Sequence, residues 1–219
     1  MTEVPSPPVL PGLAGVVLAG GAARRLGGID KPSLRVEGVP LLVTATTALR
    51  AAEPVIVVGP RRPLPADVRW VREEPPGSGP VAALAAALAL LDRLAPPSDD
   101  MTDASDTTDT TDTTGTSDAT GMTVAVLAAD LPGVTAHTVA RLWSALRGDP
   151  AADGALLVDE AGHRQWLTGI WRRAALTTAV PTEPRGASMR GTLGMSSIVE
   201  VAALADEARD IDTPEDLRP

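Results

Sequence analysis

The sequence predicts an α/β domain in which helices cover both faces of a mainly parallel β-sheet with a mixed edge. Short continuous apolar runs alternate with longer helical patterns along most of the 219 residues, and such alternation is typical of parallel sheets. A hairpin-like segment near residue 160 predicts an antiparallel strand at one edge. The 44% hydrophobic content suffices for a sizeable core, which must be aliphatic because the chain has four Trp and no Phe or Tyr.

The first half of the chain is expected to supply three strands and two helices. Residues 15–20, GVVLAG, predict a buried strand because a short apolar run ends there in glycine. Residues 54–60, PVIVVGP, and 68–73, VRWVRE, are interpreted as two further buried strands. Helices are expected at 40–52 and in the Ala- and Leu-rich residues 79–94.

The second half is expected to continue this alternation and then to depart from it. Residues 123–130, TVAVLAAD, predict a buried strand that ends in a carboxylate, and residues 135–147 predict a helix with Thr135 as its N-cap. Residues 154–171 predict two strands around a turn at 160–163. The last expected elements are a short helix near Arg190, a strand near 198–201 and a helix that begins after Thr213-Pro214.

A single domain with one insert accounts for this pattern. We expect a flexible N-terminal arm at 1–13, a single domain at 14–219 and a disordered acidic insert at 97–121. In the insert the triplet DTT occurs three times, and few apolar side chains are present to offset the entropy of ordering. The insert is interpreted as a tolerated loop expansion between a helix and a strand, with an acidic tether as the alternative.

Composition excludes several classes of partner and site. The insert carries most of the net charge of −9, so the rest of the chain lacks a strong field for nucleic acid or an anionic membrane. The absence of Cys excludes disulfides and thiolate metal sites. The first residues contain no signal-peptide pattern, and the longest apolar run, 81–91, is too short to span a bilayer. We therefore expect a cytoplasmic protein, a monomer or weak oligomer, without nucleic-acid or membrane partners.

The segment 15–31, GVVLAGGAARRLGGIDK, is the strongest candidate for a phosphate-binding loop. Its glycines do not fit G-x-G-x-x-G, and Pro32 after Lys31 does not fit the P-loop motif G-x-x-x-x-G-K-[ST]. A longer glycine loop can wrap phosphates with its backbone N–H groups. We expect Arg25 and Lys31, the only lysine of the chain, to reach those phosphates; a tight turn with solubilising cations is the alternative.

Carboxylates and a Pro/Gly loop are expected beside that segment. Asp130 ends a buried strand, and open α/β sheets bind ligands at the carboxyl ends of their strands. We expect Asp130 to bind Mg²⁺ and either Asp210 or Asp212 to offer a second carboxylate; turn and helix capping are the alternatives. Residues 74–80, EPPGSGP, form a rigid loop before a helix and are expected to contact a base edge or a phosphate.

The histidines and two of the tryptophans carry weaker signals. His137 and His163 stand alone without metal-ligand spacing and are expected at the surface. Trp166 and Trp171 lie in an apolar stretch, so core packing is favoured over a ring-stacking wall. The sequence shows no Ser–His–Asp or Cys–His set.

Together these residues resemble the MobA-like nucleotidyltransferases, most closely the molybdenum cofactor guanylyltransferases. The family signature L-A-G-G-x-[SA]-x-R-[ML]-G-x(1,2)-D-K stands at 18–31 as LAGGAARRLGGIDK, and the resemblance extends to 73–84, 127–132 and the tail at 210–217. It implies a Rossmann-like three-layer sandwich of the nucleotidyltransferase type. It also implies transfer of GMP from GTP to the phosphate of molybdopterin cofactor, with release of pyrophosphate.

The resemblance further implies roles for single residues. Arg25, Lys31 and Asp130 would be catalytic, and Asp130 and Asp212 would bind Mg²⁺. The residues implied in nucleotide binding are Leu18, Ala19, Gly20, Gly21, Arg25, Lys31 and Gly79. The candidates for acceptor binding are Arg164, Gln165, Ser188 and Arg190.

The sequence features that indicate which nucleotide base is bound point to different bases. Gly21 and the Gly-Pro loop at 79–80 favour guanine. The tail reads Asp210-x-Asp212-x-Pro214, where guanylyltransferases of this family often carry Asn-x-Asn-x-Pro, and in this it is similar to the cytidylyltransferases. The sequence is interpreted as a GTP enzyme; a cytidylyl- or sugar-phosphate nucleotidyltransferase, and a nucleotide-binding module without turnover, are the alternatives.

Overall fold

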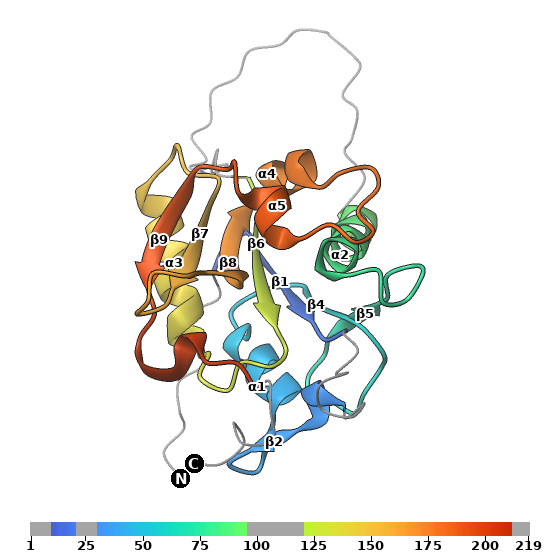
Figure 1. Cartoon of the computed structure of the whole chain (residues 1–219). Helices are drawn as coiled ribbons and strands as arrows, with labels where there is room; N and C mark the ends of the chain where they lie inside the picture. The colour runs from blue at the N-terminus through green and yellow to red at the C-terminus, as the bar shows by residue number, and fades with distance from the viewer. Residues whose placement is uncertain (1–9, 21–29, 96–120, 212–219) are drawn as a thin grey trace, which may run out of the picture.

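The computed structural model describes residues 10–20, 30–95 and 121–211, which form a three-layer α/β sandwich (Figure 1). Within these residues the central sheet has seven strands in the order β5-β4-β1-β6-β8-β7-β9. The strands are β1 (Leu13–Leu18), β4 (Val55–Val58), β5 (Arg69–Val71), β6 (Thr123–Ala128), β7 (Gly154–Val158), β8 (Arg164–Arg172) and β9 (Ile198–Ala202). Only β8 runs antiparallel to its described neighbours. The predicted mainly parallel, mixed α/β sheet is confirmed, but the antiparallel strand β8 lies between β6 and β7, and the outermost strand on that side, β9, pairs parallel with β7.

The neighbouring strands β1 and β6 are the most deeply buried part of the sheet. All residues of both strands are buried, as their continuous apolar sequences predict. Successive side chains point to opposite faces, so Val17 joins the core on one face while Val16 and Leu18 join the core on the other. The parallel pairing of Leu18 with Ala128 and with Val58 brings the carboxyl ends of β1, β4 and β6 to one edge.

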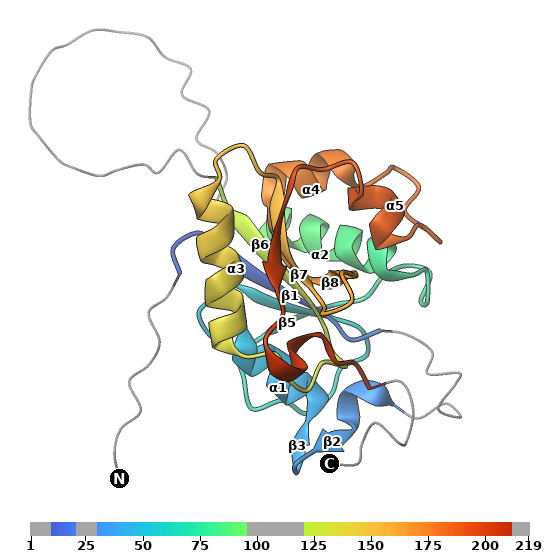
Figure 2. The ribbon, with the colours of Figure 1, turned by 60° about the vertical axis from the view of Figure 1, so that its left-hand side comes forward.

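Helices cover both faces of the sheet (Figure 2). The helices on one face are α1 (Leu41–Ala48) and α3 (Ala136–Gly148), and those on the other are α2 (Pro80–Leu94), α4 (Arg173–Ala179) and α5 (Met189–Leu193). In α3 the buried residues Val139, Leu142 and Leu146 recur with helical spacing and form the stripe that packs on the sheet. The predicted N-cap is confirmed, because the Thr135 side chain accepts a hydrogen bond from the Thr138 N–H.

The antiparallel strand β8 follows a turn that Asp159 organises. The Asp159 carboxylate accepts hydrogen bonds from the N–H groups of His163 and Ala161, and these bonds, chiefly the one from His163, hold its pKa below the ordinary value. Because β8 runs against β6, its first residues lie at the edge where β6 ends, as the pairing of Leu127 with Thr168 shows. The start of β8 therefore faces the same edge as the carboxyl ends of the central strands.

Several small elements were not expected. A hairpin joins β2 (Arg35–Val36) to β3 (Val39–Pro40) through Glu37 and Gly38, which both have positive φ. Glu-Gly is not one of the usual dipeptides for such a turn, so the sequence signal is weak. Helix α4 and the 3-10 turns η2 (Lys31–Ser33) and η3 (Ala205–Ala208) were also missed.

The structure describes only small parts of the predicted N-terminal arm, 1–13, and of the predicted acidic insert, 97–121. Leu10, placed in the arm, donates its N–H to the Ala51 carbonyl oxygen at 3.0 Å, and Leu13 begins β1 with 1% of its surface exposed. The rest of the arm, 1–9, lies outside the described residues, as does the insert apart from Gly121. Among the helices described, none has the length and apolarity needed to cross a bilayer.

Candidate active site

Lys31 and Asp130 meet at the carboxyl edge of the sheet. The Lys31 Nζ lies 3.7 Å from the Asp130 Oδ2, and the two side chains keep 18% and 29% of their surface exposed. Lys31 opens η2 in the segment after β1, and Asp130 follows β6 by two residues. Because these strands are parallel neighbours, residues 99 positions apart in the sequence form one ion pair at a ligand-accessible edge.

At the end of β1, the side chains are buried and only backbone groups face this edge of the sheet. Leu18 and Ala19 are 7% and 2% exposed, and their side chains belong to the two cores. The Leu18 carbonyl oxygen accepts the Ala129 N–H at 3.1 Å, and the Ala19 N–H donates to the Val58 carbonyl oxygen at 2.9 Å. These bonds fix the backbone that leads into the exposed Gly20. Contacts between a ligand and this strand end must therefore run through backbone groups.

Glu73 is a candidate site residue that the sequence analysis did not identify. It is only 6% exposed, its Oε1 accepts the Gly77 N–H at 2.8 Å, and its Oε2 is buried without a hydrogen-bond partner among the described residues. A Cβ at Gly20 would lie 3.6 Å from Oε1 and 3.9 Å from Oε2, so the carboxylate sits against the end of β1. Glu73 follows β5 by two residues, just as Asp130 follows β6 by two residues. This shared position after a strand is the sequence feature that could have identified Glu73 as a candidate.

The Pro/Gly loop connects this carboxylate to α2 and α5. Gly79 is the N-cap of α2 with φ of +101°, a conformation that favours glycine. The carbonyl oxygen of Ser78 accepts the Gly186 N–H at 2.9 Å, which ties the loop to the segment that leads into α5. Gly79 thus lies in a loop that two hydrogen bonds fix, one from the Gly77 N–H to Glu73 and one from the Gly186 N–H to Ser78.

Arg62 holds the residue immediately before Lys31. Its Nε donates to the Asp30 Oδ2 at 2.8 Å, its second terminal nitrogen donates to Oδ1, and its first donates to the Pro60 carbonyl oxygen at 3.0 Å. The Arg62 side chain is 12% exposed, and these hydrogen bonds hold the pKa of Asp30 below its ordinary value. The paired fork fixes geometry as well as charge, so Arg62 anchors Asp30 and thereby Lys31 to the loop after β4.

The C-terminal segment is packed against the loop that carries Asp130. The Ile211 N–H donates to the Asp130 carbonyl oxygen at 3.1 Å, and the Ile211 side chain is fully buried. A Cβ at Gly133 would lie 2.3 Å from the carbonyl oxygen of Asp206, so only glycine permits this approach. Asp210 is exposed beside Asp130's loop, which leaves its carboxylate accessible.

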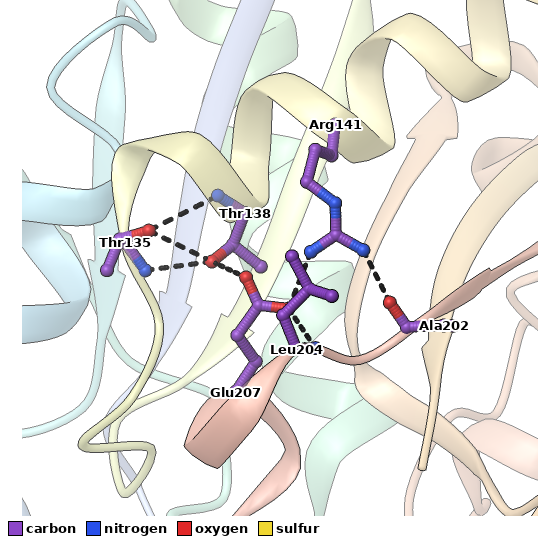
Figure 3. Close-up of polar contacts among 6 residues, drawn as sticks. All are labelled: Thr135, Thr138, Arg141, Ala202, Leu204 and Glu207. Carbon is purple, nitrogen blue, oxygen red and sulfur yellow. Dashed lines mark hydrogen bonds and ion pairs between the residues drawn. The ribbon is translucent and has the colours of Figure 1, made fainter. Parts of the chain in front are cut away.

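A buried polar network fastens the same segment to α3 (Figure 3). The Glu207 carboxylate, 6% exposed, accepts hydrogen bonds from the Thr138 hydroxyl at 2.7 Å, an Arg141 terminal nitrogen at 2.7 Å and the Leu204 N–H at 2.8 Å. The other terminal nitrogen of Arg141 donates to the Ala202 carbonyl oxygen. This network fixes the path of the chain between β9 and Ile211.

The four residues expected to bind the acceptor separate into two pairs. Arg164 and Arg190 line one cavity of about 730 Å³. Gln165 instead donates to the Asp159 Oδ2 at 3.1 Å, and the Ser188 hydroxyl caps α5 by accepting the Gly191 N–H at 3.0 Å. Local turn and cap chemistry therefore explains Gln165 and Ser188.

Three predicted site residues, Gly21, Arg25 and Asp212, lie outside the described residues. Within the described ranges no three His, Cys, Asp or Glu side chains gather as a metal cage. Asp130 is a single hard oxygen donor at an accessible edge, and that donor set fits a Mg²⁺ ion that shares its shell with substrate phosphates.

Comparison with known proteins identifies one family whose model covers most of this chain. The family model described as the MobA-like NTP transferase domain matches residues 15–201. A probable molybdenum cofactor guanylyltransferase of Opitutus terrae is 31% identical over 210 residues, which cover 94% of this chain and 87% of that protein.

Two solved structures share the fold at low identity. Molybdopterin-guanine dinucleotide biosynthesis protein A from Archaeoglobus fulgidus superposes with a TM-score of 0.57 and 18% identity, over 93% of this chain and 94% of the other. The 2-C-methyl-D-erythritol 4-phosphate cytidylyltransferase from Thermus thermophilus gives a TM-score of 0.56 and 17% identity, over 92% and 94%. The match of the family model over most of the chain shows that this protein belongs to the MobA-like NTP transferase family.

Proposed function

We propose that this nucleotidyltransferase moves GMP from GTP to the phosphate of molybdopterin and releases pyrophosphate, as a cytoplasmic enzyme. The observation that carries the proposal is the Lys31–Asp130 pair, which lies beside the end of β1 at the carboxyl edge of the sheet. The relative from Opitutus terrae, named a probable molybdenum cofactor guanylyltransferase, supports the choice of base and acceptor.

The transfer step needs no covalent intermediate with a protein side chain. An oxygen of the acceptor phosphate attacks the α-phosphorus of GTP, a new P–O bond forms, and the bond between the α-phosphorus and the bridging oxygen breaks. Pyrophosphate leaves with that electron pair. Lys31, together with Arg25, neutralises charge on the transferring and departing phosphates, because preorganised cations stabilise charge that develops in the transition state.

Asp130 is the residue assigned to Mg²⁺. Its carboxylate would hold the ion together with GTP phosphates, and Asp212 or Asp210 would supply a second carboxylate. Bound there, the ion neutralises phosphate charge and orients the leaving group. The Lys31 Nζ lies 3.7 Å from the Asp130 Oδ2, so the cation and the carboxylate are placed to act on the same phosphates.

Glu73 supports guanine as the base. A carboxylate accepts hydrogen bonds only, and guanine presents an N–H and an amino group on one edge. The Oε2 of Glu73 is buried against Gly20 and lacks a partner among the described residues, so a donor there would satisfy it. The exposed acid Asp210 in the tail favours the second candidate, a cytidylyltransferase, because guanylyltransferases often carry Asn at that position.

Thermal unfolding with each of GTP, CTP, ATP and UTP, in the presence of Mg²⁺, tests the base. We expect GTP to raise Tm most, by roughly 5–10 °C at a hundredfold excess over Kd, because a ligand stabilises the state it binds. A larger shift with CTP would favour the cytidylyltransferase. A shift with GTP but no pyrophosphate release with any acceptor would favour a nucleotide-binding module without turnover.

Arg62 gives a prediction about positioning at the same site. We expect Arg62→Gln to lower kcat/KM for GTP about tenfold, because Asp30 loses its paired hydrogen bonds and Lys31 loses its anchor. Steady-state assays of pyrophosphate release measure the effect. Arg61→Gln is the matched control, because Arg61 is exposed and makes no hydrogen bond or ion pair with the described residues. Equal rates for the two variants would exclude the positioning role.

A further inference from the structure

Glu207 is a buried carboxylate at the centre of the network in Figure 3. Glu73 and Glu207 are the only acidic side chains that are buried among the described residues. Both oxygens of Glu207 are engaged, because Oε1 accepts the Thr138 hydroxyl and Oε2 accepts Arg141 and the Leu204 N–H. A carboxylate that is 6% exposed and bonded through both oxygens is not placed to touch a metal ion or a nucleotide. Glu207 can therefore serve the active site only through the residues that it holds.

The network reaches the end of the loop that carries Asp130. This loop, residues 129–134, joins β6 to Thr135, the N-cap of α3. The Thr138 hydroxyl that donates to Glu207 also accepts the Thr135 N–H at 3.0 Å. Two consecutive hydrogen bonds thus link the carboxylate to the residue that follows the loop. Glu207 thereby restrains the point at which the loop enters α3.

The segment that contains Glu207 also contacts the middle of the same loop. Shortly after η3, the Ile211 N–H donates to the Asp130 carbonyl oxygen at 3.1 Å, and the Ile211 side chain is fully buried. A Cβ at Gly133 would lie 2.3 Å from the Asp206 carbonyl oxygen and 2.9 Å from the Glu207 nitrogen. The loop and η3 are therefore in direct backbone contact.

These contacts act on the backbone of Asp130 and leave its carboxylate accessible. The side chain keeps 29% of its surface exposed and lies 3.7 Å from the Lys31 Nζ. A hydrogen bond to the carbonyl oxygen restricts the backbone dihedrals, and these in turn restrict the side-chain rotamers. A metal ligand must be held within about 0.5 Å of its productive position, so the contacts that fix this loop matter for the ion.

We propose that Glu207 is a positioning residue for the Mg²⁺ site: by joining η3 to the start of α3, it holds the Asp130 loop against Ile211 and directs the Asp130 carboxylate toward the ion. The inference rests on the proposed function, in which Asp130 binds Mg²⁺ together with GTP phosphates. Glu207 itself touches neither the ion nor the nucleotide. The site thus extends to a buried network that the sequence analysis did not identify.

Binding of Mn²⁺, followed by electron paramagnetic resonance in the presence of an α,β-methylene analogue of GTP, tests the proposal without requiring turnover. We expect Glu207→Ala to weaken Mn²⁺ binding about tenfold, because loss of a residue that orients a metal ligand costs affinity of this order. Glu207→Gln should stay within about threefold of the unmodified protein, since an amide of the same shape can keep the neighbouring hydrogen bonds. Asp130→Asn, which removes the charged ligand itself, should weaken Mn²⁺ binding more than Glu207→Ala does.

A second variant reaches the same loop without changing the carboxylate. Gly133→Ala places a methyl group where the Asp206 carbonyl oxygen lies, so it should separate the loop from η3 and also weaken Mn²⁺ binding about tenfold. Gly148→Ala is the matched control at the other end of α3, because a Cβ there would meet nothing within 4 Å. It should bind Mn²⁺ as the unmodified protein does.

Leu146→Ala controls for lost stability. It removes a buried side chain from the last turn of α3, so it should lower Tm while Mn²⁺ affinity stays within about twofold of normal. A loss of Mn²⁺ affinity in Leu146→Ala as large as that in Glu207→Ala would overturn the proposal, because the effect would then follow stability alone.

The Asp130→Asn variant separates failure of this inference from failure of the proposed function. Normal Mn²⁺ affinity in Glu207→Ala and Gly133→Ala, with weakened affinity in Asp130→Asn, would overturn the positioning role and leave the proposed function standing. Normal Mn²⁺ affinity in Asp130→Asn would contradict the metal assignment in the proposed function, and the inference would fall with it.

Discussion

Replacing Lys31 by Ala or Asp130 by Asn is expected to lower the rate of nucleotidyl transfer at least about a hundredfold. In the proposed mechanism each change removes a charge that would face the transferring phosphates or the Mg²⁺ they share, and the two side chains are 3.7 Å apart. Pyrophosphate release at saturating GTP and Mg²⁺ measures the loss. Both side chains retain solvent contact, so the variants should fold and unfold within a few degrees of the unmodified protein.

The double variant and a control sharpen this prediction. If Lys31 and Asp130 act on the same phosphates, as proposed, the double variant should lose less than the product of the single losses. Asp67→Asn removes an exposed carboxylate that has no hydrogen bond or ion pair with the described residues, and it should keep near-normal turnover. Turnover within about threefold of normal in both Lys31→Ala and Asp130→Asn would defeat the proposed roles.

The largest effect on stability is expected at Glu207. Glu207→Ala should lower the free energy of unfolding by about 3 kcal/mol, because it leaves Arg141 and the Thr138 hydroxyl without their buried acceptor. For a chain of this size the loss corresponds to a drop in Tm of roughly 6–12 °C. Glu200→Ala is the matched control: its pair with Arg164 is exposed at the surface and should contribute less than about 1 kcal/mol.

The same carboxylate makes stability depend on pH in the acid range. Burial acts to raise the pKa of Glu207, but hydrogen bonds from Thr138, Leu204 and Arg141 outweigh it and hold the pKa below the ordinary 4.5. The stabilisation is therefore complete above 4.5 and is lost as the pH falls through the lower pKa of the folded state. The stability advantage over Glu207→Gln, measured by denaturant unfolding, should stay constant above pH 4.5 and shrink below it. An advantage that grows as the pH falls would contradict this assignment.

The sequence predicted the elements whose pattern is local and strong. Continuous apolar runs specified β1, β4 and β6, and the position of Asp130 after such a run predicted its place at the edge of the sheet. Elements with weak local signals were not predicted. The β2–β3 hairpin turns through Glu37-Gly38, which is not a usual turn dipeptide, and α4 follows β8 directly, with no Gly or Pro to mark the boundary.

The parts of the site that were missed depend on contacts between distant residues. Arg62 contacts Asp30 across 32 positions, and no local pattern distinguishes Arg62 from its neighbour Arg61. Glu73 becomes notable only because its Oε2 is buried without a partner among the described residues. Conversely, Gln165 and Ser188 have side chains suited to binding, but neighbouring turn and cap groups already occupy them.

One measurement tests the central claim most directly. The protein is incubated with Mg²⁺, molybdopterin and GTP labelled at its α-phosphorus, and both pyrophosphate and labelled product are quantified. The account predicts that label passes to the acceptor in equal amount to the pyrophosphate released, that omission of molybdopterin abolishes the reaction, and that CTP does not replace GTP. Absence of labelled product with active acceptor, or faster transfer from CTP than from GTP, would contradict it.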